Sequence, residues 1–232
     1  MKNSLTHWWG SLLSFFFQRF CPGCSSELLP YETPACLHCQ TTLPFTQFEH
    51  VHNNPIYEKL SQWTPLEEAC SIFYFEADSL LQRLVYELKF KKQQQIGYWL
   101  GILAGQKLLQ TPYEQCTALV SLPLHPKRQR QRGYNQVHLF CRALAATLSM
   151  PYTPSVIRRI KNTRQLSLNT TIDRFHEMDQ AFEMNSSSVP YMPHWLLVDD
   201  IITTGATLQS CGHTLLETPG SKLSIVTLGC RM

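Results

Sequence analysis

The chain has 232 residues, of which 44% are hydrophobic and 16% charged. This composition excludes wholesale disorder and is enough for one full α/β domain with a small appendage. The net charge of +3 is too small to predict nucleic-acid binding by itself. The charge is uneven, because the segment from Ser121 to Arg174 holds ten Lys/Arg against one acid. We therefore expect an anion site in that segment.

The chain begins with an apolar segment, Leu5 to Phe20, whose large side chains recur at helical spacing. We expect an amphipathic helix that docks on the rest of the protein. A membrane-surface helix is less favoured, because its polar positions lack the Lys/Arg that such helices carry. The segment is too short to span a bilayer and lacks a small-residue cleavage site, which predicts a cytoplasmic protein without membrane insertion.

Two Cys-x-x-Cys pairs come next and are separated by eleven residues. Their members are Cys21, Cys24, Cys36 and Cys39. Four thiolates in two tight turns suit a tetrahedral Zn²⁺ with no open coordination position, so the expected zinc is structural. His38 could replace one cysteine. Two disulfides are disfavoured, because an odd total of nine cysteines suits a reducing compartment. The remaining five are expected to be buried packing residues: Cys70, Cys116, Cys141, Cys211 and Cys230.

The pattern divides the chain into an N-terminal helix and zinc-ribbon-like module (1–45), a linker (46–68) and a main domain (69–232). The linker is predicted from a segment rich in Pro, Asn, His, Thr and Gln. The first elements expected in the main domain are a strand at Ala69–Phe75, helices at Leu80–Phe90 and Gly97–Leu109, and a strand at Ala118–Leu122. Lys89 lies in the last turn of the first helix, where a cation suits the helix dipole.

The strand at 118–122 leads into a strongly basic loop, after which Gly133 is expected to begin a helix that continues to Leu148. The loop contains Lys127, Arg128, Arg130 and Arg132. Arginine binds phosphate oxygens in pairs, so a pyrophosphate clamp is the favoured interpretation. A nucleic-acid patch ranks second and a merely solvated loop third.

After an expected surface loop at Ser186–Pro193, four apolar residues (Trp195 to Val198) precede Asp199 and Asp200. The run predicts a strand buried on both faces, and the apolar residues from Leu208 predict a helix, so the polar residues between should form a strand-to-helix turn. That turn contains Thr203, Thr204, Gly205, Ala206 and Thr207. Hydroxyls and N–H groups at a helix N-terminus favour a phosphate, and carboxylates accept from hydroxyls or bind Mg²⁺. A sugar phosphate fits both parts, whereas helix capping by the two acids is the alternative. A last strand is expected at Leu223–Leu228.

The run from Trp195 to Leu208 resembles the signature of type I phosphoribosyltransferases, which bind 5-phosphoribosyl-1-pyrophosphate (PRPP). Further motifs extend the resemblance over nearly the whole chain: Pro-Leu-His-Pro-Lys-Arg with Arg-Gly-Tyr-Asn-Gln, Arg158-Arg-x-Lys-x-Thr-x-Gln165, Arg174 and the four cysteines. Together they resemble the ComF family, also called GntX-like. Glu177 departs from the pattern, since many relatives have Asn there.

The resemblance implies an α/β fold with a type I phosphoribosyltransferase-like parallel sheet flanked by helices, beside the small zinc module. It implies that Asp199 and Asp200 hold the ribose hydroxyls, that 203–207 bind the 5-phosphate, and that the basic loop neutralises pyrophosphate with Mg²⁺. The implied ligand is PRPP or another sugar phosphate. In some relatives the implied role is DNA uptake by competent bacteria, so the rival function is a non-catalytic protein that binds single-stranded DNA or a DNA-uptake protein.

Overall fold

The computed structural model describes residues 19–29, 34–91, 93–124, 130, 135, 137–160, 181–185 and 189–231. Most of the helix expected at Leu5–Phe20 lies outside these ranges. The expectation is wrong at its end, because Arg19–Phe20 is a strand, β1. β1 pairs antiparallel with β2 (Glu27–Leu28), and this ladder closes the turn that carries the first cysteine pair. Within the described residues, no helix is both long and apolar enough to cross a bilayer.

The central sheet has four strands in the order β3-β8-β7-β4, and all neighbours are parallel. The strands are β3 (Glu68–Tyr74), β4 (Ala118–Ser121), β7 (His194–Ile202) and β8 (Lys222–Cys230). A separate antiparallel pair consists of β5 (Ile157–Arg159) and β6 (Phe182–Met184). The parallel strands have buried side chains on both faces, which explains why their sequences show runs of apolar residues without alternation.

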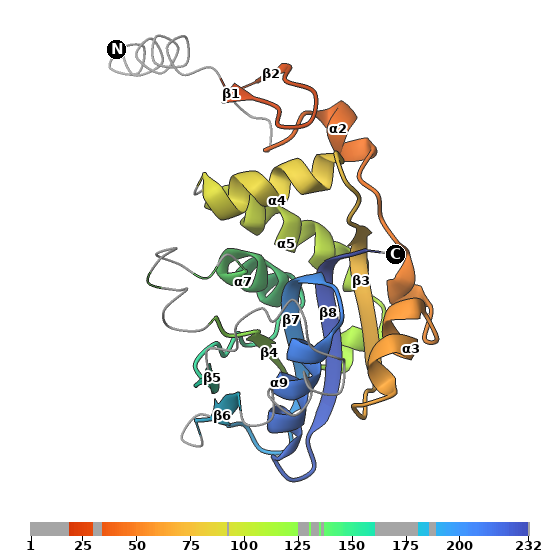
Figure 1. The fold of residues 1–232 in the computed structure, drawn as a ribbon, viewed down its shortest axis with the longest axis vertical. Coiled ribbons are helices and arrows are strands. Elements are labelled where there is room, and N and C mark those ends of the chain that lie inside the picture. Colours follow the sequence, from red (N-terminus) through yellow and green to blue (C-terminus); the bar gives the residue numbers. More distant parts are fainter. Residues whose placement is uncertain are drawn as a thin grey trace, which may run out of the picture.

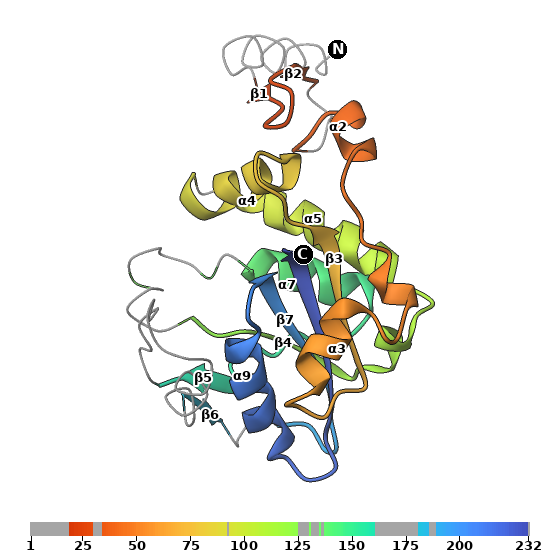
Figure 2. The same cartoon turned by 45° about the vertical axis from the view of Figure 1, so that its right-hand side comes forward.

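Helices cover both faces of the sheet (Figures 1 and 2). One apolar core joins the sheet to α4 (Leu80–Phe90), α5 (Gln94–Leu108) and α7 (His138–Thr147). A second core joins the other face to α3 (Pro55–Ser61) and α9 (Ala206–Leu216). Short helices α2 (Leu37–Thr41), η1 (Phe48–His50) and η2 (Pro112–Gln115) complete the described elements. The predicted α/β class with a parallel sheet flanked by helices is therefore confirmed.

The segment 46–68, expected as a linker, contains η1 and α3. Asn54 explains the start of α3: its side-chain oxygen accepts from the N–H groups of Ile56 and Tyr57, and Pro55 occupies the first helical position. The amide of Asn54 also donates to the carbonyl oxygen of Ala69 in β3, at 2.7 Å. Ile56 and Leu60 are buried in the second core, so this segment is part of the folded domain.

The cysteine module packs against α4 (Figure 1). Its residues Cys21, Cys39 and Leu43 belong to the same apolar core as Leu80. The approach is close at Gly23, where an added Cβ would lie 2.7 Å from Leu80 Cδ1 and 2.6 Å from Cys39 Sγ. The module therefore covers one end of the α4 helix, and the two parts share a core.

Candidate functional site

Asp199 and Asp200 lie inside β7, near its carboxyl end. The sequence predicts both acids at the end of a strand, and in the structure that strand continues two residues past them. β7 continues to Ile202, because β8 beside it keeps the ladder in register, with Asp199 opposite Thr227 and Ile201 opposite Gly229. The strand orientation fixes both acids at the edge where parallel α/β sheets bind ligands.

The two carboxylates are held by the backbone of the same strand. Asp199 Oδ1 accepts from the N–H of Asp200 at 2.8 Å, and Asp200 Oδ1 accepts from the N–H of Ile201 at 2.7 Å. Burial raises the pKa of Asp199 well above its usual range, and the charge of Asp200 raises it further. The positive charges of Lys89 and Arg159 oppose this rise without cancelling it. The site therefore resists holding two negative charges and favours a cationic or hydroxyl-bearing ligand.

Lys89 is one of the residues of this site that the sequence does not predict. It lies in the last turn of α4, and its Nζ is 2.5 Å from Asp200 Oδ2. The sequence accounts for Lys89 only as a cation that suits the end of a helix. Nothing in the local pattern predicts a partner in a strand so distant along the chain, because the contact depends on how α4 packs over the sheet.

The loop after β7 is a tight turn that leads into α9. Thr203 and Thr204 are exposed, while Gly205 adopts a φ of +82°, in the left-handed region, immediately before α9 begins. Lys59 of α3 donates to the carbonyl oxygen of Thr203. Exposed hydroxyls thus stand beside the N-terminus of α9, with a lysine ammonium from α3 close by.

The basic loop leaves the sheet next to the acid pair. β4 pairs in parallel with β7, and the N–H of Leu122 still donates to the carbonyl oxygen of Val198 at 2.8 Å. Arg130 is exposed. The other three predicted cations, Lys127, Arg128 and Arg132, lie outside the described residues. At the far end of the loop, the Asn135 amide donates to the carbonyl oxygen of Leu122 at 3.4 Å, which brings the two loop ends together.

A hydrogen-bonded chain also connects β4 to the start of α7. The Ser121 hydroxyl lies 2.9 Å from the Tyr152 hydroxyl, which lies 3.2 Å from His138 Nδ1. Desolvation lowers the pKa of His138, and the nearby charge of Arg142 lowers it further. A neutral His138 can accept from Tyr152, so this chain fixes the base of the basic loop without adding charge.

The second arginine cluster contributes one residue, Arg159, to the electrostatics of the acid pair. Arg158 and Arg159 form the end of β5, and Arg158 binds Glu183 of β6 at 2.9 Å. Arg159 is the one whose charge acts on Asp199. The guanidinium of Arg159 also lies over the ring of Phe182, 5.5 Å from its centroid. Arg174 and Glu177 lie outside the described residues.

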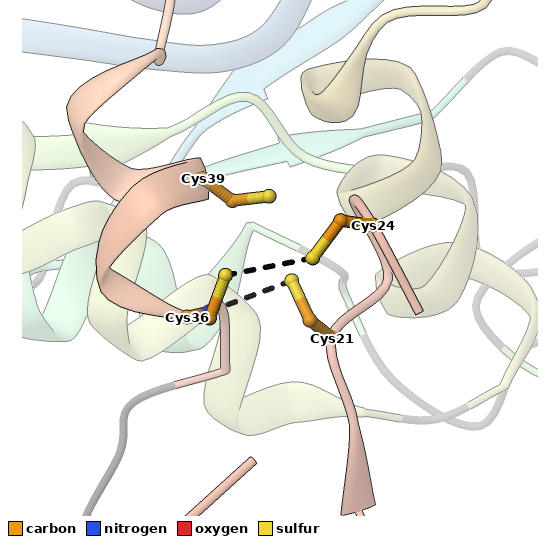
Figure 3. A group of neighbouring side chains, drawn as sticks. All are labelled: Cys21, Cys24, Cys36 and Cys39. Carbon is orange, nitrogen blue, oxygen red and sulfur yellow. Dashed lines mark hydrogen bonds between the residues drawn. The ribbon is translucent and has the colours of Figure 1, made fainter. Parts of the chain in front are cut away.

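The four predicted cysteines come together in a single cluster (Figure 3). All four Sγ atoms lie within 4.8 Å of one another, and Cys24 Sγ is 3.6 Å from Cys36 Sγ. A zinc ion with Zn–S bonds of about 2.3 Å needs sulfurs about 3.8 Å apart, so the geometry suits Zn²⁺. His38 is exposed and is not part of this group.

The thiols of this cluster also differ in their ease of ionisation. The hydroxyl and N–H of Ser26 lower the pKa of Cys24 to about 6, while burial raises the pKa of Cys39 above its usual value. Cys36 donates its backbone N–H to Cys21 Sγ at 3.4 Å, an arrangement that stabilises a thiolate. The other five cysteines are buried and have no disulfide, as predicted for packing residues.

Sequence comparison places the chain among known proteins, although no family model matches it. It is 27% identical over 201 residues to Competence protein F of Haemophilus influenzae, covering 84% of this chain and 83% of that protein. It is 30% identical over 156 residues to DNA utilization protein YhgH of Salmonella typhimurium, covering 65% of this chain and 67% of that protein. Among solved structures, adenine phosphoribosyltransferase from Saccharomyces cerevisiae is 19% identical with a TM-score of 0.38, covering 67% of this chain and 75% of that chain. The chain therefore belongs to the ComF/YhgH (GntX-like) family of phosphoribosyltransferase-like proteins.

Proposed function

We propose that the protein binds PRPP at the carboxyl edge of the sheet and that, as an enzyme, it displaces pyrophosphate from this ligand. The observation that carries the proposal is the position of Asp199 and Asp200 at the end of β7, directly before exposed Thr203 and Thr204 and the start of α9. A carboxylate pair beside a helix N-terminus matches a ligand that has both ribose hydroxyls and a phosphate.

Each part of the ligand has a matching part of the site. The 5-phosphate would accept from the hydroxyls and N–H groups of 203–207, a segment that includes Ala206 and Thr207 at the first positions of α9. The ribose hydroxyls would donate to Asp199 and Asp200. The pyrophosphate would lie toward the loop that leaves β4, where Lys127, Arg128, Arg130 and Arg132 would neutralise it.

The reaction would break the bond between the anomeric carbon and the pyrophosphate oxygen, which keeps the electron pair, while a nucleophile such as a base nitrogen or ammonia forms the new bond. Positive charge develops on the ribose during this exchange, and the nearby carboxylates stabilise it electrostatically. The protein therefore contributes positioning and charge, with no nucleophilic side chain. Mg²⁺, when bound with PRPP, would add charge neutralisation of the leaving group.

The cysteine cluster supports a structural Zn²⁺ as part of this proposal. Four sulfur ligands complete a tetrahedral shell and leave no position for a substrate. The cluster shares its apolar core with α4, the helix that carries Lys89. Zinc would thus stabilise the helix that reaches the acid pair, and it would take no part in the chemistry.

A second candidate function is DNA handling without catalysis. The printed names of the relatives, Competence protein F and DNA utilization protein, favour it, as do the two arginine-rich segments. Phosphate contacts by Lys and Arg supply most non-specific binding to DNA, and the basic loop could serve this role as well. Family membership alone does not decide between the two functions.

Isothermal titration of the purified, zinc-loaded protein with PRPP, with and without Mg²⁺, tests the first proposal. We expect saturable binding that is lost in Asp199→Asn and retained in a surface variant such as Glu217→Gln, because Glu217 is exposed after α9. Absence of heat and of competition by pyrophosphate, with DNA binding intact, would favour the second function.

A further inference from the structure

Lys89 occupies the place beside Asp200 where a ligand-bound cation is expected. Its Nζ contacts Asp200 Oδ2 at 2.5 Å, with only 21% of the lysine side chain and 13% of the aspartate side chain exposed. A pair so little exposed is screened less by water and salt than a surface ion pair. The ammonium is therefore a firmly placed resident counter-ion of the acid pair.

The helix that carries Lys89 is well fixed. Leu84 and Val85 of α4 are buried in the core shared with α5, and Leu88 is buried as well, so the backbone position of Lys89 is set by packing. The neighbouring lysine behaves differently, since Lys91 Nζ binds Glu87 within the same helix at 2.7 Å and its side chain is 59% exposed. Of these two lysines, only Lys89 reaches the sheet, and Lys91 serves as a matched comparison.

Among the described residues, three carboxylate oxygens of the acid pair have partners. Asp199 Oδ1 and Asp200 Oδ1 accept from backbone N–H groups, and Asp200 Oδ2 binds Lys89. A divalent cation binding Asp200 Oδ2 must displace an ammonium from the same oxygen. The two cations compete, because both are attracted to one carboxylate and repel each other at short distance.

We propose that Lys89 is a ligand-positioning residue that stands in for the divalent cation at Asp200. It suppresses binding of a free divalent cation to the acid pair, and it lowers the dependence of anionic-ligand binding on that cation. An ammonium has three N–H donors, so Lys89 can bind Asp200 and still donate to an oxygen of a phosphorylated ligand. The ligand part of this inference rests on the proposed function, whereas the cation part does not.

The test uses zinc-loaded full-length protein and Mn²⁺ as a spectroscopic substitute for Mg²⁺. Electron paramagnetic resonance measures free Mn²⁺ in titrations of wild type, Lys89→Met and Lys91→Met. Removing the competing ammonium should tighten Mn²⁺ binding roughly tenfold in Lys89→Met, whereas Lys91→Met should match wild type. Lys89→Gln gives the same comparison if the methionine variant is poorly folded by circular dichroism.

Two outcomes would overturn the inference: equal Mn²⁺ affinity in wild type and both Lys89 variants, or a gain that persists when Asp200→Asn is added to Lys89→Met. A separate PRPP titration at several Mg²⁺ concentrations completes the design. There, Lys89→Met should need more Mg²⁺ than wild type for the same affinity. A wild type that binds no PRPP would contradict the proposed function and leave the Mn²⁺ result to decide the role of Lys89.

Discussion

Gly205 lies directly against Leu60, such that a Cβ added to the glycine would be 2.6 Å from Leu60 Cδ2. The contact joins the loop after β7 to α3, a helix in the segment expected to be a linker. The close approach, together with the left-handed φ of Gly205, fixes the path from the acid pair into α9. The candidate phosphate loop is therefore shaped by a side chain distant from it in sequence.

Replacing Gly205 by alanine should accordingly weaken both the fold and the ligand site. The strained φ and the clash with buried Leu60 predict a loss of about 1–3 kcal/mol in the free energy of unfolding, and PRPP affinity should fall because the loop must shift. Gly220→Ala is the matched control: Gly220 also has a positive φ, of 73°, but its Cβ would meet only the flexible side chain of Met192. Denaturant unfolding and PRPP titration of both variants check this. Normal PRPP affinity in Gly205→Ala would show that the loop does not bind the ligand.

The acid pair should show opposite effects on stability in its two members. Burial raises the pKa of Asp199 in the folded state. As the pH rises above about 4, the pKa of an aspartate in the unfolded chain, ionisation of Asp199 therefore favours the unfolded state. Asp199→Asn cannot ionise, so its melting temperature should exceed that of wild type by about 2–4 °C near pH 7, and the difference should vanish toward pH 4. Asp200→Asn should instead lower the melting temperature, because Lys89 loses its charged partner.

Calorimetry of both variants between pH 4 and pH 8 measures this asymmetry, and PRPP titration accompanies it. We expect PRPP binding to be lost in both variants. If Asp199→Asn raises the melting temperature and also abolishes PRPP binding, then Asp199 lowers the stability of the fold and serves to bind the ligand. Equal melting temperatures for wild type and Asp199→Asn at every pH would contradict the argument from burial.

The cysteine cluster predicts one tightly held zinc per chain. Elemental analysis of protein prepared without added metal should give nearly equimolar zinc, and Cys39→Ser should lose it, since metal-binding energy is folding energy in such modules. Because Cys39 shares a core with Leu80, loss of zinc should also lower the melting temperature of the main domain. Cys211→Ala, in the opposite core, is the control and should keep its zinc. Fully folded, zinc-free wild type would refute the assignment.

Local signals explain which elements the sequence predicts well. α4 begins and ends at the predicted residues, and Ser79 caps it by accepting from the N–H of Gln82. β3 and β4 match because buried parallel strands appear as apolar runs. α3 was missed because its segment resembles a loop in composition, although the Asn54 and Pro55 pair is a helix-start signal that could have been found.

Local sequence patterns also predict the candidate site only in part. The four cysteines could be grouped from spacing alone, because both pairs are short-range motifs whose spacing suits a single zinc ion. Lys89 and Lys59 could not be assigned, since their contacts with Asp200 and Thr203 arise only when α4 and α3 pack around the sheet. The extension of β7 through Asp200 likewise depends on pairing with β8, which overrides the low strand propensity of aspartate.

The PRPP and DNA functions make different demands on the basic loop. β4 lies beside β7, so the loop that leaves it starts next to the acid pair, and its cations would face the same ligand. A triple variant with alanine at Lys127, Arg128 and Arg130 should therefore lose PRPP affinity, and free pyrophosphate should compete with PRPP in wild type. Arg158→Ala is the control, because Arg158 is exposed and binds Glu183 in the antiparallel β5–β6 pair.

A nucleic-acid role gives a different result in the same variants. DNA affinity would fall with salt at a log-log slope of roughly −0.7 to −0.9 per phosphate contacted, and each cation removed would reduce that slope by about one contact. We expect the triple variant to lose PRPP binding whether or not DNA binding also weakens, because the pyrophosphate must be neutralised beside two carboxylates. A triple variant that binds PRPP normally but no longer binds DNA would reverse this assignment and make the loop a DNA contact.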